Sequence, residues 1–334
     1  MYHIGLDARA LEAGFKAHLG RGTGRYAGEL IKNLEQLSRE GKTPDLAFRL
    51  VGSSQLSPTV CDRRVIDWLP FGKMTFESQV LFARRIAKTG VSMMHFFAHG
   101  DAPALSRVAQ VVTVLDLIPL RFPHLYRANK ANLRFKFARF LEYQAIKRSL
   151  GVLAISEATK QDVVNLLGVE PDRIFVTPLA VSENFAARDL SPGNWREEAA
   201  QKRRLLALPV ENPILLYVGG IDPRKNVPFL LRVFAEVLRV WPHRNRPLLV
   251  LVGKHENDDQ LPQLLKEAER LEITANLRRP GFVPDELLRS YYQCADAVVF
   301  PSLYEGFGLP VLEAMACGVP VVAGKNSSIP EVAG

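Results

Sequence analysis

The sequence predicts an α/β fold that consists of two doubly wound, Rossmann-like domains facing a cleft. The chain has 334 residues, more than one compact core usually accommodates. Hydrophobic residues make up 47% and charged residues 23% of the chain, as in folded globular proteins. Short apolar runs also alternate with segments of helical spacing, and this order is typical of parallel sheets covered by helices on both faces.

The second half of the chain shows this alternation most clearly. Residues 214–220 form an apolar run that ends in two glycines, and residues 227–240 follow with apolar side chains on one helical face. We expect strands at residues 214–220, 247–253, 279–283, 295–301 and 319–323, and helices at residues 227–240, 260–271, 285–293 and 310–317.

The first half follows the same pattern less evenly. We expect strands at residues 3–7, 47–52, 65–68, 93–97, 111–115, 152–155 and 173–177, and helices at residues 24–40, 76–89, 128–149 and 157–168. A polar segment that contains Pro192 and Gly193 separates the two halves. The predicted organisation is a first domain over residues 1–185, a linker over residues 186–212 and a second domain over residues 213–334.

The net charge of +8 is unevenly distributed. Residues 121–148 contain eight basic side chains and Glu142 as the one acid, so this window carries nearly all of the excess. Such a basic face suits a phosphate-rich partner (nucleic acid, an anionic membrane or a nucleotide), or it is a solvated helix face. In the second interpretation, Phe137 and Phe140 belong to an apolar stripe that packs on the core.

Several classes of protein are excluded or disfavoured. No apolar run approaches the ~18 residues of a membrane span, and residues 1–9 lack the features of a signal peptide, so we expect a cytoplasmic protein. Cys61, Cys294 and Cys317 are far apart, which argues against a disulfide framework and a thiolate zinc site. His95 and His99 lack an acidic partner for a zinc site and are interpreted as ordinary histidines.

Residues 301–318 carry the strongest local pattern. A strand ends at Pro301, and a glycine-bearing loop leads into a helix with Pro310 in its first turn. The amide groups of that turn and the helix dipole together form an anion site. Glu305 and Glu313 lie beside it, where carboxylates suit the hydroxyl groups of a sugar or ribose. The alternative is a loop acid and a surface helix acid with no shared role.

A second pattern, YVGGIDPRKN, occupies residues 217–226. Gly219 and Gly220 close a strand, and Arg224 and Lys225 precede the next helix. Arginine offers a planar fork to phosphate and lysine offers a point charge, so the pair can neutralise a diphosphate. Ligands of such sheets bind beyond the carboxyl ends of the strands, which favours this role over that of two solvated cations.

Together these motifs resemble the nucleotide-sugar half of the GT-B glycosyltransferases, and the chain is most similar to the large retaining family four. The matching pieces run in order through nearly the whole chain, which is more specific than any single piece. They are IGLDAR at 4–9, GTGRYAGEL at 22–30, VVTVLDLIPLRFP at 111–123, ISEATKQDVVNLLGV at 155–169, RIFVTPLAVSENF at 173–185, VGG-x3-RKN at 218–226, PGFVPDELL at 280–288 and PSLYEGFGLPVLEAMACGVPVVA at 301–323.

The resemblance implies a role for each matching residue. Arg224 and Lys225 would bind the donor diphosphate. Glu305 would contact the transferred sugar near the reacting carbon, and Glu313 would hold the ribose hydroxyls. Asp116 is implied as a further catalytic residue. The other implied donor contacts are Gly22, Gly24, Gly219, Gly220, Phe282, Val283, Pro284, Phe307, Gly308 and Leu309. On the acceptor side the candidates are Arg25 and His99, which follows a predicted strand.

One position departs from the family pattern. Leu115 stands where many members have a histidine, and a leucine cannot donate a hydrogen bond to a sugar. Either the neighbouring Asp116 suffices, another group supplies the contact, or the enzyme is slow.

Gly22, Gly24 and Ala27 also match half of a dinucleotide fingerprint. They lie far beyond the first strand, and no acid follows the second, which argues against hydride transfer.

The resemblance implies transfer of a hexose, with retention of configuration, from a nucleoside-diphosphate sugar to a hydroxyl of a glycan or lipid-linked glycan. The PRKN sequence is similar to that of members in polysaccharide and O-antigen assembly, which favours GDP-mannose as the donor. Cations and helix amides can stabilise the leaving diphosphate, so we expect no metal ion or other cofactor. Expected partners are the nucleotide sugar, the glycan acceptor and, through a peripheral contact, an anionic membrane, but no nucleic acid.

Other interpretations stay open. The chain could be a catalytically silent nucleotide-sugar-binding protein, a nucleic-acid binder that uses residues 121–148, or a sugar epimerase or phosphorylase of the same fold. Family members continue beyond the position of Gly334 with another strand and further helices, so we also expect the C-terminal domain to be incomplete.

Overall fold

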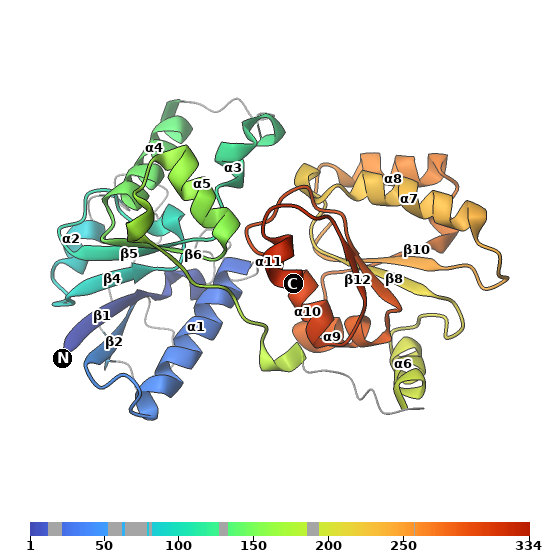
Figure 1. Cartoon of the computed structure of the whole chain (residues 1–334), viewed down its shortest axis with the longest axis horizontal. Coiled ribbons are helices and arrows are strands. Elements are labelled where there is room, and N and C mark those ends of the chain that lie inside the picture. Colours follow the sequence, from blue (N-terminus) through green and yellow to red (C-terminus); the bar gives the residue numbers. More distant parts are fainter. Residues whose placement is uncertain are drawn as a thin grey trace. The chain divides into compact units, whose positions relative to one another are not determined.

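The computed structural model describes residues 1–12, 22–52, 62–63, 79, 82–126, 133–185, 194–256 and 258–334. These residues form two compact units, Met1–Pro178 and Leu179–Gly334. In Figure 1 the first runs from blue to light green and the second from yellow-green to red. Each unit is a parallel sheet covered by helices, so the predicted fold class is confirmed.

The first unit contains a sheet of seven described strands in the order β3-β2-β1-β4-β5-β6-β7, in which every pair is parallel. The central position of β1 and the reversal of strand order beside it are typical of a doubly wound fold. The strands are β1 (Tyr2–Asp7), β2 (Leu46–Val51), β3 (Asp62–Arg63), β4 (Met93–Phe96), β5 (Ala109–Val114), β6 (Gly151–Ala154) and β7 (Ile174–Val176). The helices are α1 (Gly22–Arg39), α2 (Phe82–Ile86), α3 (Ile118–Arg121), α4 (Leu133–Arg148) and α5 (Glu157–Leu167).

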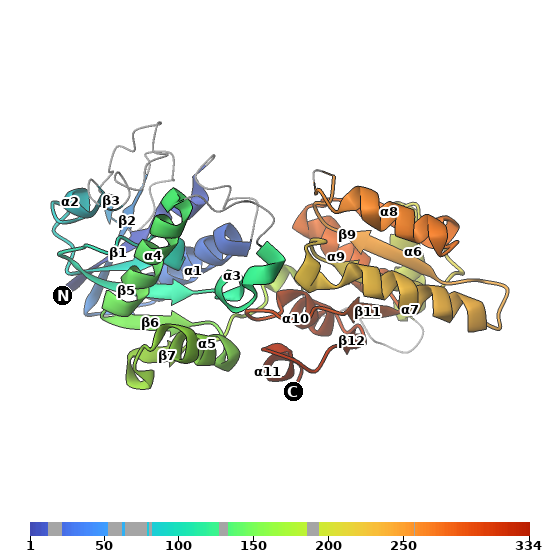
Figure 2. The ribbon, with the colours of Figure 1, turned by 90° about the horizontal axis from the view of Figure 1, so that it is seen from above.

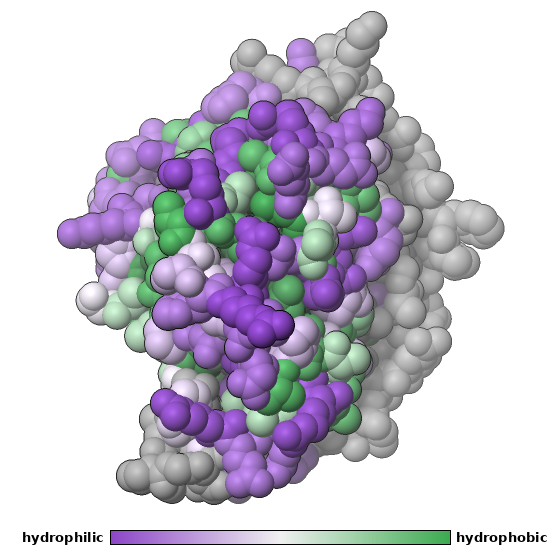
Figure 3. Space-filling model, turned by 90° about the vertical axis from the view of Figure 1, so that its right-hand side faces the viewer, coloured by the Kyte–Doolittle hydropathy of each residue, from purple (hydrophilic) through white to green (hydrophobic). Residues whose placement is uncertain are grey.

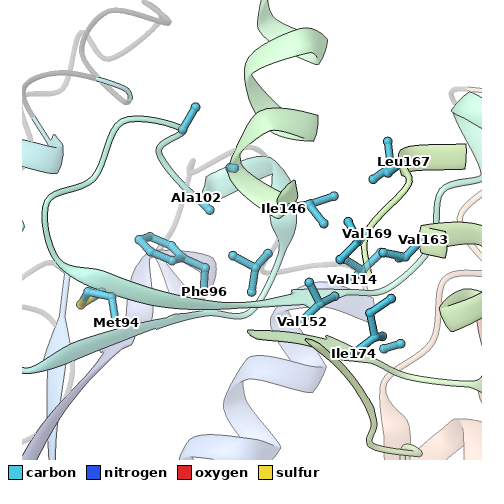
Figure 4. Close-up of a cluster of buried hydrophobic side chains, with 14 of the residues drawn as sticks. Met94, Phe96, Ala102, Val114, Ile146, Val152, Val163, Leu167, Val169 and Ile174 are labelled. Atoms are coloured by element: carbon cyan, nitrogen blue, oxygen red, sulfur yellow. The ribbon is translucent and has the colours of Figure 1, made fainter. Parts of the chain in front are cut away.

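Alternate residues of these strands serve the two faces of the sheet. Met94 and Phe96 of β4 face the helices α2, α4 and α5 and belong to the core cluster shown in Figure 4. On the opposite face, Ile4 and Leu6 of β1 pack with residues of α1. Side chains of successive strand residues point to opposite faces, and this alternation places α1 against the face that carries His95.

The second unit contains a sheet of five parallel strands in the order β10-β9-β8-β11-β12. They are β8 (Ile214–Val218), β9 (Leu248–Val252), β10 (Leu277–Gly281), β11 (Ala297–Phe300) and β12 (Val321–Ala323). The helices are α6 (Asn194–Leu205), α7 (Val227–Val240), α8 (Leu261–Arg270), α9 (Asp285–Cys294), α10 (Leu309–Ala316) and α11 (Ile329–Ala333). Helices α7 and α8 cover one face, and α6, α9 and α10 cover the other (Figures 1 and 2).

The face of the second unit that Figure 3 shows is mostly hydrophilic, and its hydrophobic residues form small separate patches. The apolar stripe of α7 faces inward through Leu230, Leu231 and Phe234, which are buried against β8 and β9. Burial of that stripe, rather than helix propensity, supplies most of the stability of such a helix.

Most predicted elements are present within two or three residues of their expected ends. The strand expected at 279–283 lies two residues earlier, at Leu277–Gly281, because its pairing with β9 begins at Leu277 and ends at Gly281. The strand expected at 65–68 and Pro192-Gly193 lie outside the described residues, and the helices expected at 76–89 and 128–149 are described only from Phe82 and Leu133.

The expected linker at 186–212 differs from the structure, in which its described part belongs to the second unit. Residues 194–205 form α6, which packs against α9. Arg203 of α6 donates hydrogen bonds to the carbonyl groups of Cys294, Val210 and Asn212 and pairs with Asp296. One buried arginine thus anchors an otherwise charged helix to the second unit.

Candidate functional site

The two motifs of the second unit follow neighbouring strands. Residues 219–226 follow β8, and residues 301–308 follow β11, which is hydrogen-bonded to β8. Because both strands are parallel, the two loops leave the sheet at the same edge. The amide of Leu303 donates to the carbonyl of Arg224 at 2.7 Å and joins the loops directly.

Glu305 lies between the two predicted cations. One carboxylate oxygen is 2.6 Å from an Nη of Arg224 and the other is 2.6 Å from Nζ of Lys225. Arg224 also contacts Asp222 at 3.2 Å, and the Lys225 ammonium lies 5.1 Å from the ring centre of Phe300. Two positive and two negative charges therefore meet in one place, where charge-assisted hydrogen bonds are strong.

The cluster is largely buried, and the burial shifts its pKa values. Burial alone would raise the pKa of Glu305, which is 7% exposed, but the charges of Lys225 and Arg224 outweigh it and hold the pKa below its ordinary value. Burial raises the pKa of Asp222, although the same two cations act against the shift. Burial and the nearby charges of Glu305 and Asp222 raise the pKa of Tyr217 well above its usual range. Glu305 is thus the firmly ionised acid of the cluster.

Two serines hold the loop that carries Glu305. The Ser327 hydroxyl accepts a hydrogen bond from the Glu305 amide at 3.0 Å. The Ser328 hydroxyl lies within hydrogen-bond distance of the carbonyl oxygens of Glu305 and Phe307. Both serines stand before α11, over twenty residues further along the chain, and no local sequence signal identifies them as part of the site.

Helix α10 begins directly after this loop. Gly308 is its N-cap residue and has φ 108°, a conformation that favours glycine. Its carbonyl accepts hydrogen bonds from the amides of Val311 and Leu312, and Pro310 contributes no amide hydrogen. The positive end of the helix therefore lies next to the segment that contains Glu305, and it adds a favourable field for an anion.

Glu313 lies inside α10 and is buried. One of its carboxylate oxygens accepts a hydrogen bond from the Tyr292 hydroxyl of α9 at 2.9 Å. The sequence places Glu305 on a loop and Glu313 within a helix, and the structure agrees. It adds Tyr292, a buried partner that orients the Glu313 carboxylate.

The remaining donor-side residues also lie beyond the carboxyl ends of strands in this unit. Phe282 and Pro284 follow β10 and are exposed, Val283 is partly buried, and Pro284 is the N-cap residue of α9. Gly219 and Gly220 are partly buried after β8. Phe307 is buried and Leu309 partly buried at the start of α10. The structure therefore brings the second-unit residues to one edge of one sheet.

The other candidate residues belong to the first unit. Asp116 follows β5 and accepts a hydrogen bond from the amide of Ile118 at 3.1 Å. Gly22, Gly24 and Arg25 lie in the first turn of α1, and His99 begins a short 3-10 helix after β4. A β-carbon at Gly22 would meet no other atom within 4 Å among the described residues of this unit, so none of their contacts requires a glycine there.

His95 is a core histidine. Its Nε2 lies 2.8 Å from the Thr113 hydroxyl, which in turn lies 3.2 Å from the hydroxyl of Tyr26. Burial lowers the pKa of His95 to about 4, so the ring is neutral at ordinary pH. Among the described residues, no three His, Cys, Asp or Glu side chains are grouped as metal ligands.

The two parallel-sheet units and the motifs at the carboxyl ends of their strands define the GT-B class. A model of the glycosyltransferases group 1 family matches residues 198–334, and a model of glycosyltransferase family 4 matches residues 20–185. The chain belongs to this group 1 and family 4 type of glycosyltransferase.

Three curated relatives show the range of similarity. O-antigen chain mannosyltransferase B of Escherichia coli is 35% identical over 199 residues, covering 59% of this chain and 49% of the relative. Serotype-specific mannosyltransferase WbdA of E. coli is 32% identical over 261 residues, covering 75% and 30%. A D-inositol 3-phosphate glycosyltransferase of Kineococcus radiotolerans is 34% identical over 185 residues, covering 54% and 41%. The chain thus spans less than half of the length of these relatives.

Solved structures share the fold at low sequence identity. Anabaena HepE, in complex with UDP and glucose, has a TM-score of 0.67 and 17% identity, and the match covers 99% of this chain and 83% of that one. WaaG, a glycosyltransferase involved in lipopolysaccharide biosynthesis, has a TM-score of 0.69 and 16% identity, with the same coverage.

Helices long and apolar enough to cross a membrane are absent from the part of the chain that the structure describes.

Proposed function

We propose that the chain transfers a hexose from a nucleoside-diphosphate sugar to a hydroxyl of a glycan or lipid-linked glycan, with retention of configuration. One observation carries the proposal: Arg224, Lys225 and Glu305 form a buried, charged cluster at the carboxyl edge of a parallel sheet, beside the N-terminus of α10. Mannose from GDP-mannose is the proposed donor, and the names of the E. coli relatives support this choice.

The cluster suits the difficult step of such a transfer. The bond between the anomeric carbon and the diphosphate oxygen breaks, and negative charge grows on the leaving diphosphate. Arg224, Lys225 and the positive end of α10 would stabilise that charge. The acceptor oxygen forms the new bond to the anomeric carbon, and its proton passes to the departing phosphate. Because protein cations supply the compensating charge, we propose that no divalent metal is needed.

The donor assignment is tested by binding and turnover. A thermal-shift panel of UDP, GDP, dTDP and ADP should give an appreciable rise in melting temperature for one nucleotide, GDP in this proposal, because a ligand stabilises only the state that binds it. Arg224→Ala and Lys225→Ala should each lower turnover by orders of magnitude, whereas Arg239→Ala, on the exposed side of α7, should not. Unchanged activity in both site variants would remove the diphosphate assignment.

Two further measurements separate the rival interpretations. A silent binding protein would bind the donor without transferring or slowly hydrolysing it. An epimerase or phosphorylase would produce an altered sugar nucleotide or a sugar phosphate instead of a glycoside. The anomeric configuration of the product, read by NMR, tests retention, and activity in the presence of EDTA tests the independence from metal.

The surface of α4 supports a peripheral contact with an anionic membrane, which would suit a lipid-linked acceptor. Phe137 and Phe140 are 57% and 54% exposed. The expectation that they form an apolar stripe packed on the core is therefore wrong. Lys136, Lys147 and Arg148 are exposed on the same helix. Exposed aromatic and basic side chains on one helix favour an interfacial contact.

Exposed aromatic rings beside basic side chains can also stack on bases, so nucleic acid is the rival partner for this surface. Membrane binding is measured by sedimentation with vesicles that contain or lack anionic lipid, at low and high salt. Binding of a labelled oligonucleotide is measured under the same salt conditions, so that the two candidate partners can be compared. Salt-sensitive binding to anionic vesicles alone supports the membrane contact. Equal binding to neutral vesicles, or preferential binding to the oligonucleotide, contradicts it.

A further inference from the structure

The two glycines after β8 have their carbonyl groups fixed by side chains of the protein interior. The Nε2 of His255 lies 2.8 Å from the carbonyl oxygen of Gly219. The hydroxyl of Tyr217 donates to the carbonyl oxygen of Gly220. His255 is 2% exposed and Tyr217 is fully buried, so both carbonyl groups point into the unit.

This arrangement determines where the adjoining amide groups point. In a trans peptide the N–H is directed opposite to the carbonyl of the same peptide unit. The N–H groups of Gly220 and Ile221 are therefore directed away from His255 and Tyr217. Within the described residues, neither N–H donates to another protein group. Consecutive N–H groups directed away from the interior form a concave site for an anion, here four and three residues before Arg224.

The fit between His255 and this loop is close. A β-carbon at position 253 would overlap the carbonyl oxygen of Gly219 and would lie 2.8 Å from the Nε2 of His255. Gly253 has φ 154° and its amide donates to the carbonyl of Gly281 at 3.0 Å. The backbone after β9 thus leaves room for an imidazole to reach the neighbouring loop. Since a carbonyl oxygen can only accept, the Nε2 of His255 carries a proton.

We propose that His255 is a positioning residue for the donor diphosphate. It acts through the Gly219 carbonyl and directs the N–H groups of Gly220 and Ile221 toward a phosphate, next to the charges of Arg224 and Lys225. The inference rests on the proposed function, because it assigns a residue to the same donor site. His255 itself touches no donor atom in this proposal, and its side chain stays inside the unit.

Two substitutions separate positioning from simple packing. His255→Gln keeps an N–H donor at a reach similar to that of Nε2, whereas His255→Leu keeps bulk but loses the donor. His243→Leu, at an exposed position in the same unit, is the control. For each protein we would measure the dissociation constants of GDP, UDP and inorganic diphosphate by calorimetry, the donor KM and kcat, and the free energy of unfolding in urea.

The proposal predicts a donor effect that is separate from stability. His255→Leu should weaken binding of the diphosphates about tenfold, which corresponds to the loss of roughly one hydrogen bond. His255→Gln should restore most of the lost affinity. The KM for the donor should follow the same order. If His255→Leu does not fold, His255→Asn, which is too short to reach Gly219, takes its place.

Each outcome decides the question. If His255→Leu binds the diphosphates as the wild type does, or if His255→Gln and His255→Leu lose binding equally, the positioning role is wrong. If the wild type itself binds neither GDP, UDP nor inorganic diphosphate, the proposed function fails and the inference fails with it.

Discussion

Glu305 sets the charge that Arg224 and Lys225 can offer to a ligand. Each cation gives one short ion pair to this carboxylate. If the proposed function holds, an incoming diphosphate must share the cations with Glu305 or displace it. Like charges a few ångströms apart repel strongly in a buried site, so Glu305 and a phosphate oppose one another until Glu305 turns to another partner such as a sugar hydroxyl.

Substitution of Glu305 by glutamine should therefore have opposite effects on binding and on transfer. Glu305→Gln removes the competing charge, and we expect the dissociation constant for the nucleoside diphosphate to fall about tenfold while sugar transfer falls by orders of magnitude. Calorimetry and a product assay measure the two effects. Glu269→Gln, which changes an exposed side chain of α8, is the control. Weaker nucleotide binding in Glu305→Gln would mean that Glu305 organises the cations instead of competing for them.

His95 makes stability depend on pH. In the folded chain burial lowers its pKa to about 4 from the ordinary 6.5, so between these values the unfolded chain binds a proton that the folded chain does not. Stability is therefore highest above pH 6.5 and is lost as the pH falls toward 4, by on the order of 3 kcal/mol for this group. Urea unfolding from pH 7.5 to 4 measures the free energy of unfolding of the wild type and of His95→Gln. The difference between these two free energies should change with pH. A constant difference would contradict the assignment.

At the scale of elements, α6 belongs to the second unit because of Arg203. This buried side chain satisfies three backbone carbonyl groups and pairs with Asp296, which also accepts from the amide of Ile214 at the start of β8. A helix of charged residues thus becomes attached to the beginning of the central strand.

Removal of that arginine should destabilise the second unit. Arg203→Met leaves buried carbonyl groups without donors, at a cost of about 2–4 kcal/mol in the free energy of unfolding. Arg204→Met changes the adjacent, exposed arginine and should cost less than about 0.5 kcal/mol. Urea denaturation compares the two variants. Equal effects would show that α6 is held by its apolar contacts alone.

At the scale of the whole molecule, each of the five core clusters formed by the described residues lies within a single unit. The donor-side cluster of Arg224, Lys225 and Glu305 also lies entirely within Leu179–Gly334. A unit with its own core can fold alone, so the proposed function implies that binding of the nucleotide and transfer of the sugar can be separated.

We therefore expect residues 179–334, expressed alone, to unfold cooperatively and to bind the nucleoside diphosphate without transferring sugar. Residues 1–178 should fold but bind no nucleoside diphosphate. Thermal unfolding with and without nucleotide measures both properties. A folded 179–334 fragment that binds no nucleotide, beside a full chain that does, would show that donor binding requires the first unit.

Periodicity and turn chemistry predicted the strands, the helices and the doubly wound class, because these depend on neighbours in the sequence. The helix at 227–240 was predicted to the residue, since its apolar stripe and the proline at its start are local signals. The attachment of α6 and the exposure of Phe137 and Phe140 were not predictable in this way. Both depend on which distant surface a helix meets.

The sequence by itself determined which residues could hold a diphosphate, since VGG-x3-RKN and E-x7-E each lie within one short segment after a strand. Only the tertiary structure decided that Glu305 lies between Arg224 and Lys225, which are 81 and 80 residues away, and that His255 reaches Gly219. The physical reason is that parallel strands distant in sequence bring their carboxyl ends to one edge, where side-chain pairing follows from strand order and register.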